Sequence, residues 1–160
     1  MKLYVMRHGP AEDFSASGRD ADRALTSSGR DRVRDVARAL VSEDEAPNVI
    51  FTSPLVRARQ TAEIVAAVTK LESRGGAVEI ATELAPGGDE VSFVNALVRD
   101  QKKRAMLVGH EPDLSALVQA LTSRRVEMLK ALVVGISARE DGMRLRFVLD
   151  PKSLTWERAQ

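Results

Sequence analysis

Short apolar segments alternate with amphipathic segments along most of this chain, and that alternation restricts the fold more than any other feature of the sequence. Between the apolar segments, hydrophobic residues recur at helical spacing, as at Val33, Val36, Ala37 and Leu40. Strands separated by helices predict an α/β fold, a three-layer α/β/α sandwich with a mostly parallel central sheet and helices on both faces. The apolar segments with the length of buried strands are residues 2–7, 49–52, 78–80 and 105–109.

The C-terminal part of the chain has a different pattern of apolar residues. Residues 131–136 form an apolar run, and residues 144–149 follow with Leu145, Phe147 and Leu149 at alternate positions. With Gly142 between them, the two segments predict a terminal antiparallel hairpin. The sequence shows no interdomain linker, and its 160 residues predict one domain over residues 1–160.

The charge balance and the cysteine content narrow the function classes. With 24 basic and 23 acidic residues the formal net charge is +1, which predicts neither nucleic-acid nor membrane binding. The chain has no cysteine, which excludes disulfides and cysteine nucleophiles and fits a reducing cytoplasm. The apolar run at the N-terminus is too short for a signal peptide, and no run reaches the roughly 20 apolar residues of a membrane span. We therefore expect a cytoplasmic location.

Each of the two histidines directly follows one of the predicted strands: His8 follows residues 2–7 and His110 follows residues 105–109. In an open parallel sheet, ligands bind at the carboxyl ends of the strands. A neutral imidazole is a nucleophile when one nitrogen is free and the other is held by a hydrogen-bond acceptor. We therefore expect a catalytic pocket built on His8 and His110.

Two arginines strengthen that expectation. Arg7 precedes His8, and a guanidinium binds tetrahedral oxyanions through two parallel hydrogen bonds. Ser53 and Pro54 predict a helix start with Ser53 as the cap, which places Arg57 in a first turn whose free amides also attract phosphate.

Metal and nucleotide motifs are missing from the sequence. His110-Glu111 lacks the second histidine of a zinc-binding helix, and there is no phosphate-binding glycine loop. Asp20 and Asp22 are weak Mg²⁺ candidates, because they lie in the polar segment 10–24, which predicts an exposed loop. We expect neither a metal nor a cofactor.

Four motifs follow one another along the chain: Arg7-His8-Gly9, Leu25-Thr26-x-x-Gly29, Ser53-Pro54-Leu55-x-Arg57-Ala58-x-Gln60-Thr61-Ala62 and Gly109-His110-Glu111-Pro112. In this order they resemble the histidine phosphatase superfamily, the phosphoglycerate-mutase-like fold, and the likeness extends to the segment around Pro151. The small size and the segment 84–89 are most similar to the SixA-type phosphohistidine phosphatases.

This resemblance implies a metal-independent phosphatase with a covalent intermediate. His8 would attack phosphorus, and Arg7, Arg57 and His110 would bind the transferring group and stabilise its charge. Arg23 would extend the anion pocket. The implied partner is a phosphohistidine-containing protein, such as a phosphotransfer protein of a signalling or sugar-transport system, with phosphate or another anion in the active site.

One position departs from the larger relatives of the superfamily. Phosphomonoesterases and mutases usually carry a glutamate two residues after the leucine that corresponds to Leu84, and it protonates the leaving alkoxide. That position is Pro86 here, which has no proton to donate. Because an imidazole leaves without that help, the departure favours phosphohistidine over phosphate esters.

Two other functions stay open from the sequence. One is a small-molecule phosphomonoesterase, with Glu83, Glu111 or a residue of the loop 10–24 as the acid. The other is a noncatalytic phosphate-binding module, against which the retention of all four motifs argues.

Overall fold

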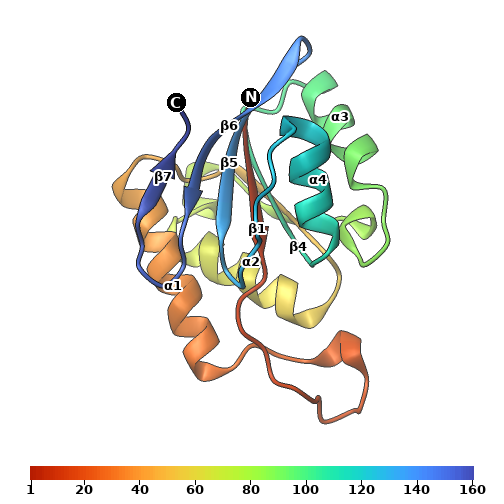
Figure 1. Ribbon diagram of the computed structural model, residues 1–160. Coiled ribbons are helices and arrows are strands. Elements are labelled where there is room, and N and C mark those ends of the chain that lie inside the picture. The colour runs from red at the N-terminus through yellow and green to blue at the C-terminus, as the bar shows by residue number, and fades with distance from the viewer.

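The computed structural model describes residues 1–160 and contains one sheet of seven strands (Figure 1). The strands are β1 (Lys2–Arg7), β2 (Val49–Thr52), β3 (Val78–Ile80), β4 (Arg104–Gly109), β5 (Val133–Arg139), β6 (Gly142–Leu149) and β7 (Trp156–Arg158). Their order across the sheet is β3-β2-β4-β1-β5-β6-β7.

The sheet divides at β1 into a parallel half and an antiparallel half. Strands β3, β2, β4 and β1 pair in parallel, whereas β5 pairs antiparallel with β1 and continues through β6 and β7. The predicted terminal hairpin is confirmed as β5 and β6. The sequence did not predict β7, which packs Trp156 against Phe147 with ring centroids 4.7 Å apart.

Four helices cover the sheet, two on each face, which confirms the three-layer architecture (Figure 1). Because side chains alternate along a strand, Tyr4 and Met6 pack against α1 and α2, and Leu3 and Val5 pack against α3 and α4. None of the helices is long and apolar enough to cross a membrane. The helices are α1 (Ser27–Ser42), α2 (Val56–Val68), α3 (Glu90–Arg99) and α4 (Asp113–Thr122), with single 3₁₀ turns η1 (Asp20–Asp22), η2 (Glu72–Arg74) and η3 (Thr82–Leu84).

The structure shows how α1 begins and corrects the predicted start of α2. Thr26 caps α1, and its hydroxyl oxygen accepts a hydrogen bond from the Gly29 amide at 2.9 Å. The predicted start of α2 at Ser53-Pro54 is wrong, because α2 begins at Val56. The hydroxyl of Ser53 accepts from the Leu55 amide in the turn before the helix and also contacts His110, so it is used outside the helix.

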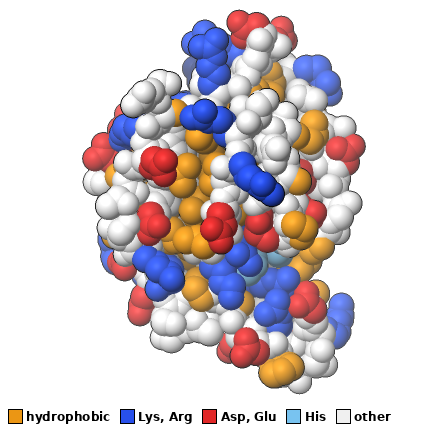
Figure 2. Space-filling model, in the orientation of Figure 1, with side chains coloured by type: hydrophobic (Ala, Val, Ile, Leu, Met, Phe, Trp, Pro, Cys, Tyr) orange, Lys and Arg blue, Asp and Glu red, His pale blue; other side chains and the backbone are white.

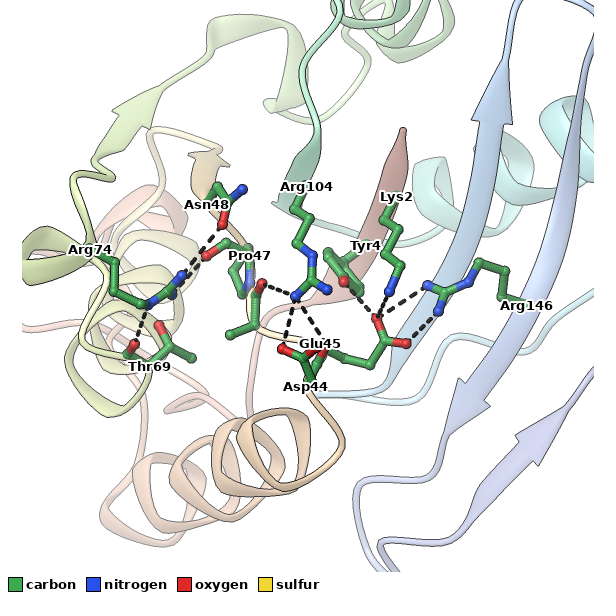
Figure 3. A network of polar contacts seen from close by, with 11 residues as sticks. Lys2, Tyr4, Asp44, Glu45, Pro47, Asn48, Thr69, Arg74, Arg104 and Arg146 are labelled. Carbon is green, nitrogen blue, oxygen red and sulfur yellow. Dashed lines mark hydrogen bonds and ion pairs between the residues drawn. The ribbon is translucent and has the colours of Figure 1, made fainter.

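A buried ion-pair network lies at the amino end of β1, opposite to His8 (Figure 3). Glu45 is only 4% exposed, and it accepts hydrogen bonds from the Tyr4 hydroxyl at 2.6 Å and from Arg146. The ammonium of Lys2 lies 3.6 Å from the same carboxylate. One carboxylate thus joins β1, β6 and the loop after α1.

Candidate active site

The pairing of β1 with β4 brings the two histidines together. Arg7 lies opposite Gly109 in this parallel pair, so each histidine is the first residue after the paired ends. The amide of His8 donates to the carbonyl of Gly109 at 3.2 Å. The two imidazole centroids are 5.2 Å apart, close to the spacing of neighbouring strands.

A cavity of about 240 Å³ lies at this end of the sheet. All five residues that the sequence predicted for the site, including Arg23, line this one cavity. Figure 2 shows basic side chains gathered around the pale blue histidine surface. The complete lining consists of Arg7, His8, Ala11, Arg23, Arg57, His110, Glu111 and Lys130.

The ring of His8 is fixed with one nitrogen protonated. Its Nδ1 lies 2.8 Å from the carbonyl oxygen of Gly9, and because a carbonyl only accepts, Nδ1 carries the hydrogen. Nε2 therefore keeps its lone pair. Burial, with smaller contributions from His110 and the neighbouring arginines, lowers the pKa of His8 to about 3, so the ring is neutral at pH 7.

Gly9 allows the chain to pass close to α1 immediately after the histidine. A Cβ atom at this position would lie 2.6 Å from Cγ2 of Val33, too close for any side chain. The Gly9 amide also donates to the Thr61 hydroxyl at 3.0 Å. These contacts fix the turn that carries His8 and explain the glycine of the Arg7-His8-Gly9 motif.

His110 is held by the residue that was expected to begin α2. Its Nε2 lies 2.7 Å from the Ser53 hydroxyl oxygen, and both side chains are buried. Its Nδ1 is buried and has no hydrogen-bond partner. Burial, and then the charge of Arg57, lowers the pKa of His110 to about 4.

The guanidinium groups of Arg7 and Arg57 each donate a hydrogen bond to a backbone carbonyl. Arg7 Nη1 donates to the Met128 carbonyl at 3.0 Å, and Arg57 donates to the Asp20 carbonyl at 2.9 Å and to the Asp20 carboxylate at 3.2 Å. The Nε–H groups of both arginines are buried without a partner, as is Nδ1 of His110. Unpaired buried polar groups are costly, and here they belong to residues around one small cavity. An oxyanion is the ligand that would satisfy the guanidinium groups.

The loop between β1 and α1 reaches back to these arginines. The carboxylate of Asp20 contacts both Arg57 and Arg23, the latter at 2.9 Å, and so links the two guanidinium groups. Arg23 also donates to the Glu12 carbonyl at 3.0 Å. The carboxylate of Asp22 accepts a hydrogen bond from Ser17 at 2.7 Å.

Of the acidic residues considered as proton donors, Glu111 lines the cavity. Its carboxylate accepts hydrogen bonds from the Ser115 amide at 2.8 Å and from the Ser115 hydroxyl, at the start of α4. Glu83 lies in η3, where it is exposed and away from the cavity lining, and Pro86 is exposed as well.

The sequence did not reveal Lys130, which adds a further cation to the cavity. It precedes Ala131, whose left-handed conformation (φ 70°) directs its amide to the carbonyls of Arg7 and His8, each at 3.1 Å. These bonds hold the segment before β5 against the end of β1. No motif or periodicity marks Lys130 in the sequence.

Known proteins resemble this chain in sequence and in structure. A model of the histidine phosphatase superfamily (branch 1) matches residues 3–83. An uncharacterized protein from Picosynechococcus sp. is 37% identical over 143 residues, which are 85% of this chain and 84% of that protein. Phosphohistidine phosphatase SixA of Escherichia coli strain K12 is 32% identical over 124 residues, 76% of this chain and 74% of SixA. A structure of the protein histidine phosphatase SixA complexed with tungstate matches with a TM-score of 0.88 and 26% identity, covering 97% of this chain and 100% of that one.

Proposed function

This chain belongs to branch 1 of the histidine phosphatase superfamily and is a phosphatase, and we propose that it removes phosphate from phosphohistidine in proteins by way of a phosphorylated His8. The observation that carries the proposal is the convergence of one free imidazole nitrogen with Arg7, Arg57 and His110 on a single cavity.

In the first step, the lone pair of His8 Nε2 attacks phosphorus. The new P–N bond forms as the P–N bond of the substrate breaks. The substrate imidazole, whose other nitrogen carries a proton, takes that electron pair and leaves as a neutral ring. Arg7, Arg57 and His110 bind the non-bridging oxygens, whose charge spreads in the transition state. The Nδ1–H of His8 stays bonded to Gly9, which orients the attacking ring.

In the second step, water attacks the phosphorus of phospho-His8. The P–N bond to Nε2 breaks, His8 recovers its lone pair, and inorganic phosphate leaves the cavity. The same three residues bind the oxygens again, so both steps use one anion site. No step requires a metal.

The leaving group decides between phosphohistidine and phosphate esters. Transfer of a phosphoryl group from one imidazole to another is nearly balanced in energy, whereas an alkoxide leaves poorly unless an acid protonates it. The resemblance puts Pro86 where the larger relatives carry that acid, and the carboxylate of Glu111 accepts hydrogen bonds from Ser115. Both points favour an N–P substrate.

The relatives support an anion in the cavity. The SixA structure that matches this chain was solved with tungstate, a tetrahedral oxyanion that resembles phosphate in shape and charge. SixA of Escherichia coli is named a phosphohistidine phosphatase. We infer that phosphate occupies the cavity of this chain in the same way.

Transfer of ³²P from a phosphohistidine protein tests the covalent step directly. Wild type is expected to acquire acid-labile label, and His8→Ala is expected to acquire none. His110→Ala is the matched control: it retains Nε2 of His8, so it should still be labelled, at a lower rate. Full turnover by His8→Ala would contradict the mechanism.

Ester substrates test the leaving-group argument. We expect hydrolysis of activated aryl phosphates, whose leaving groups need no proton, and little hydrolysis of alkyl phosphates. Comparable rates on both classes would favour a phosphomonoesterase, with Glu111 as the first candidate acid because it lines the cavity. In that case Glu111→Gln should abolish the alkyl activity alone.

A further inference from the structure

Phe14 is the most exposed of the large hydrophobic side chains, with 86% of its surface accessible. It lies in the loop that begins after His8 and ends at Leu25, and it has no part in the chemistry proposed above. The other exposed large hydrophobic residues lie on helices α1 and α3 or on the edge strand β3.

The position of Phe14 relative to the cavity follows from the length of the chain between them. Ala11 lines the cavity, and three residues of chain span at most about 11 Å. A protein partner typically covers about 800 Å² of each surface, a patch of roughly 16 Å radius. Phe14 is therefore close enough to the cavity to contact a protein docked over it.

Hydrogen bonds on both sides of Phe14 order the loop that carries it. At its base, the Glu12 amide donates to the Ala24 carbonyl at 2.8 Å, and Ala11 bridges to Leu25. Beyond Phe14, the Ser15 hydroxyl donates to the Arg19 carbonyl at 2.7 Å. An aromatic side chain on an ordered loop binds with little loss of conformational entropy.

The size of the cavity indicates what reaches into it. A volume of about 240 Å³ is below the range of about 300–1,000 Å³ typical of sites that enclose whole small molecules. It accommodates a phosphoryl group and the imidazole that carries it, while the rest of the substrate stays outside, over the rim.

We propose that Phe14 is the anchor of a docking surface for the protein that presents the phosphohistidine, an inference that rests on the proposed function. The partner is a folded protein with an apolar patch beside its phosphohistidine. Glu12 and Asp13 precede Phe14 and are exposed, so basic residues of the partner should flank that patch. Buried aromatic anchors of this kind carry much of the affinity of protein interfaces.

The experiment compares a ³²P-labelled histidine phosphotransfer protein with free phosphohistidine as substrates. Phe14→Ala is expected to lower kcat/KM for the phosphoprotein about tenfold, through KM, and to leave kcat/KM for free phosphohistidine unchanged. Phe14→Leu should recover most of the loss. Val41→Ala, which removes an exposed apolar side chain near the C-terminal end of α1, is the matched control and should match wild type on both substrates.

The outcomes separate the two proposals. Equal activity of Phe14→Ala and wild type on the phosphoprotein overturns the docking surface and leaves the proposed function intact. An equal loss on both substrates also overturns it, because Phe14 would then act on the site itself. A wild type that cleaves free phosphohistidine but not the phosphoprotein again overturns docking. A wild type inactive on both substrates overturns the proposed function, and the docking surface with it.

Discussion

At the scale of single residues, the chemistry depends on how each imidazole is held. His8 donates from Nδ1 to a backbone carbonyl, and His110 is bonded at Nε2 by the Ser53 hydroxyl. Opposite nitrogens of the two rings are thus engaged. The free nitrogen of His8 suits attack on phosphorus, and the free nitrogen of His110 suits contact with a phosphoryl oxygen.

Both histidines are expected to stay neutral well into the acid range. Because burial lowers their pKa values to about 3 and about 4, their Cε1 proton resonances should barely move between about pH 8 and about pH 5.5. In urea-unfolded protein the same resonances should titrate near the ordinary value of about 6.5. A midpoint near that value in the folded protein would contradict the burial argument.

Ser53→Ala is expected to lower kcat about tenfold, because the imidazole of His110 loses its only hydrogen-bond partner and the ring is free to turn. The expected loss is in kcat for both phosphohistidine and aryl phosphates. Thr69→Ala removes another buried hydroxyl, one that bonds to Val65 far from the cavity, and should leave kcat at the wild-type value. An equal effect of the two substitutions would mean that Ser53 acts only through stability.

The sequence predicted the site residues at the ends of strands better than those that reach the site from loops. Arg7, His8 and His110 could be placed because strand ends meet at one edge of a parallel sheet. Lys130 could not, because its position depends on the two hydrogen bonds of Ala131 to the end of β1. Such long-range backbone bonds leave no trace in composition or spacing.

At the scale of elements, α3 begins with a conflict between helix electrostatics and burial. Glu90 is its first residue, where the helix dipole favours a negative charge, yet it is only 5% exposed and neither carboxylate oxygen has a partner. Burial, with the charges of Asp113 and Glu111, raises its pKa to about 8. The start of α3 is therefore less stable when Glu90 ionises.

Glu90→Gln should raise the free energy of unfolding by about 3 kcal/mol at pH 7. The pKa of Glu90 in the folded protein lies above its value in the unfolded chain. Below about pH 4.5 the carboxyl is protonated in both states and costs no stability, and wild type loses stability as the pH rises from there toward 8. The gain of the variant should therefore vanish near pH 4.5. Urea unfolding at several pH values measures it, with the exposed Glu83→Gln as the control. A gain independent of pH would contradict this account.

The elements themselves were largely predictable, and the error at α2 has a clear cause. Ser53-Pro54 is typical of a helix start, but the Ser53 hydroxyl bonds to His110, 57 residues away in sequence, and the helix begins at Val56. Strand β7 was missed because it is three residues long and depends on pairing with β6. In both cases a tertiary contact overrides the local pattern.

At the scale of the whole molecule, the cavity and the buried ion-pair network lie at opposite ends of the sheet. The carboxyl ends of β1 and β4 carry the cavity, and the amino end of β1 carries the Glu45 network (Figure 3). Burial alone would raise the pKa of Glu45, but hydrogen bonds from Arg146 and Tyr4 hold it below its ordinary value. The network thus joins distant segments without touching the reactive groups.

Glu45→Ala is expected to lower the free energy of unfolding by about 3–5 kcal/mol at pH 7, because it leaves Arg146 and Tyr4 without their partner. Glu43→Ala breaks an exposed pair with Arg158 and should cost less than about 1 kcal/mol. The pKa of Glu45 in the folded protein lies below its ordinary value. Its contribution to the free energy of unfolding is therefore complete at pH values above the ordinary pKa, and is lost as the pH falls through the pKa of the folded protein. Urea unfolding at neutral and acid pH checks both statements; similar losses in the two variants would refute the special role of Glu45.

The bonds from Ala131 to the carbonyls of Arg7 and His8 have a consequence for synthesis on the ribosome. His8 is translated well before Ala131, whose amide holds the carbonyls of Arg7 and His8. A nascent chain that ends before Ala131 therefore lacks the contact that fixes the backbone of His8. On the proposed function, such a chain should not hydrolyse phosphohistidine until this segment has been made.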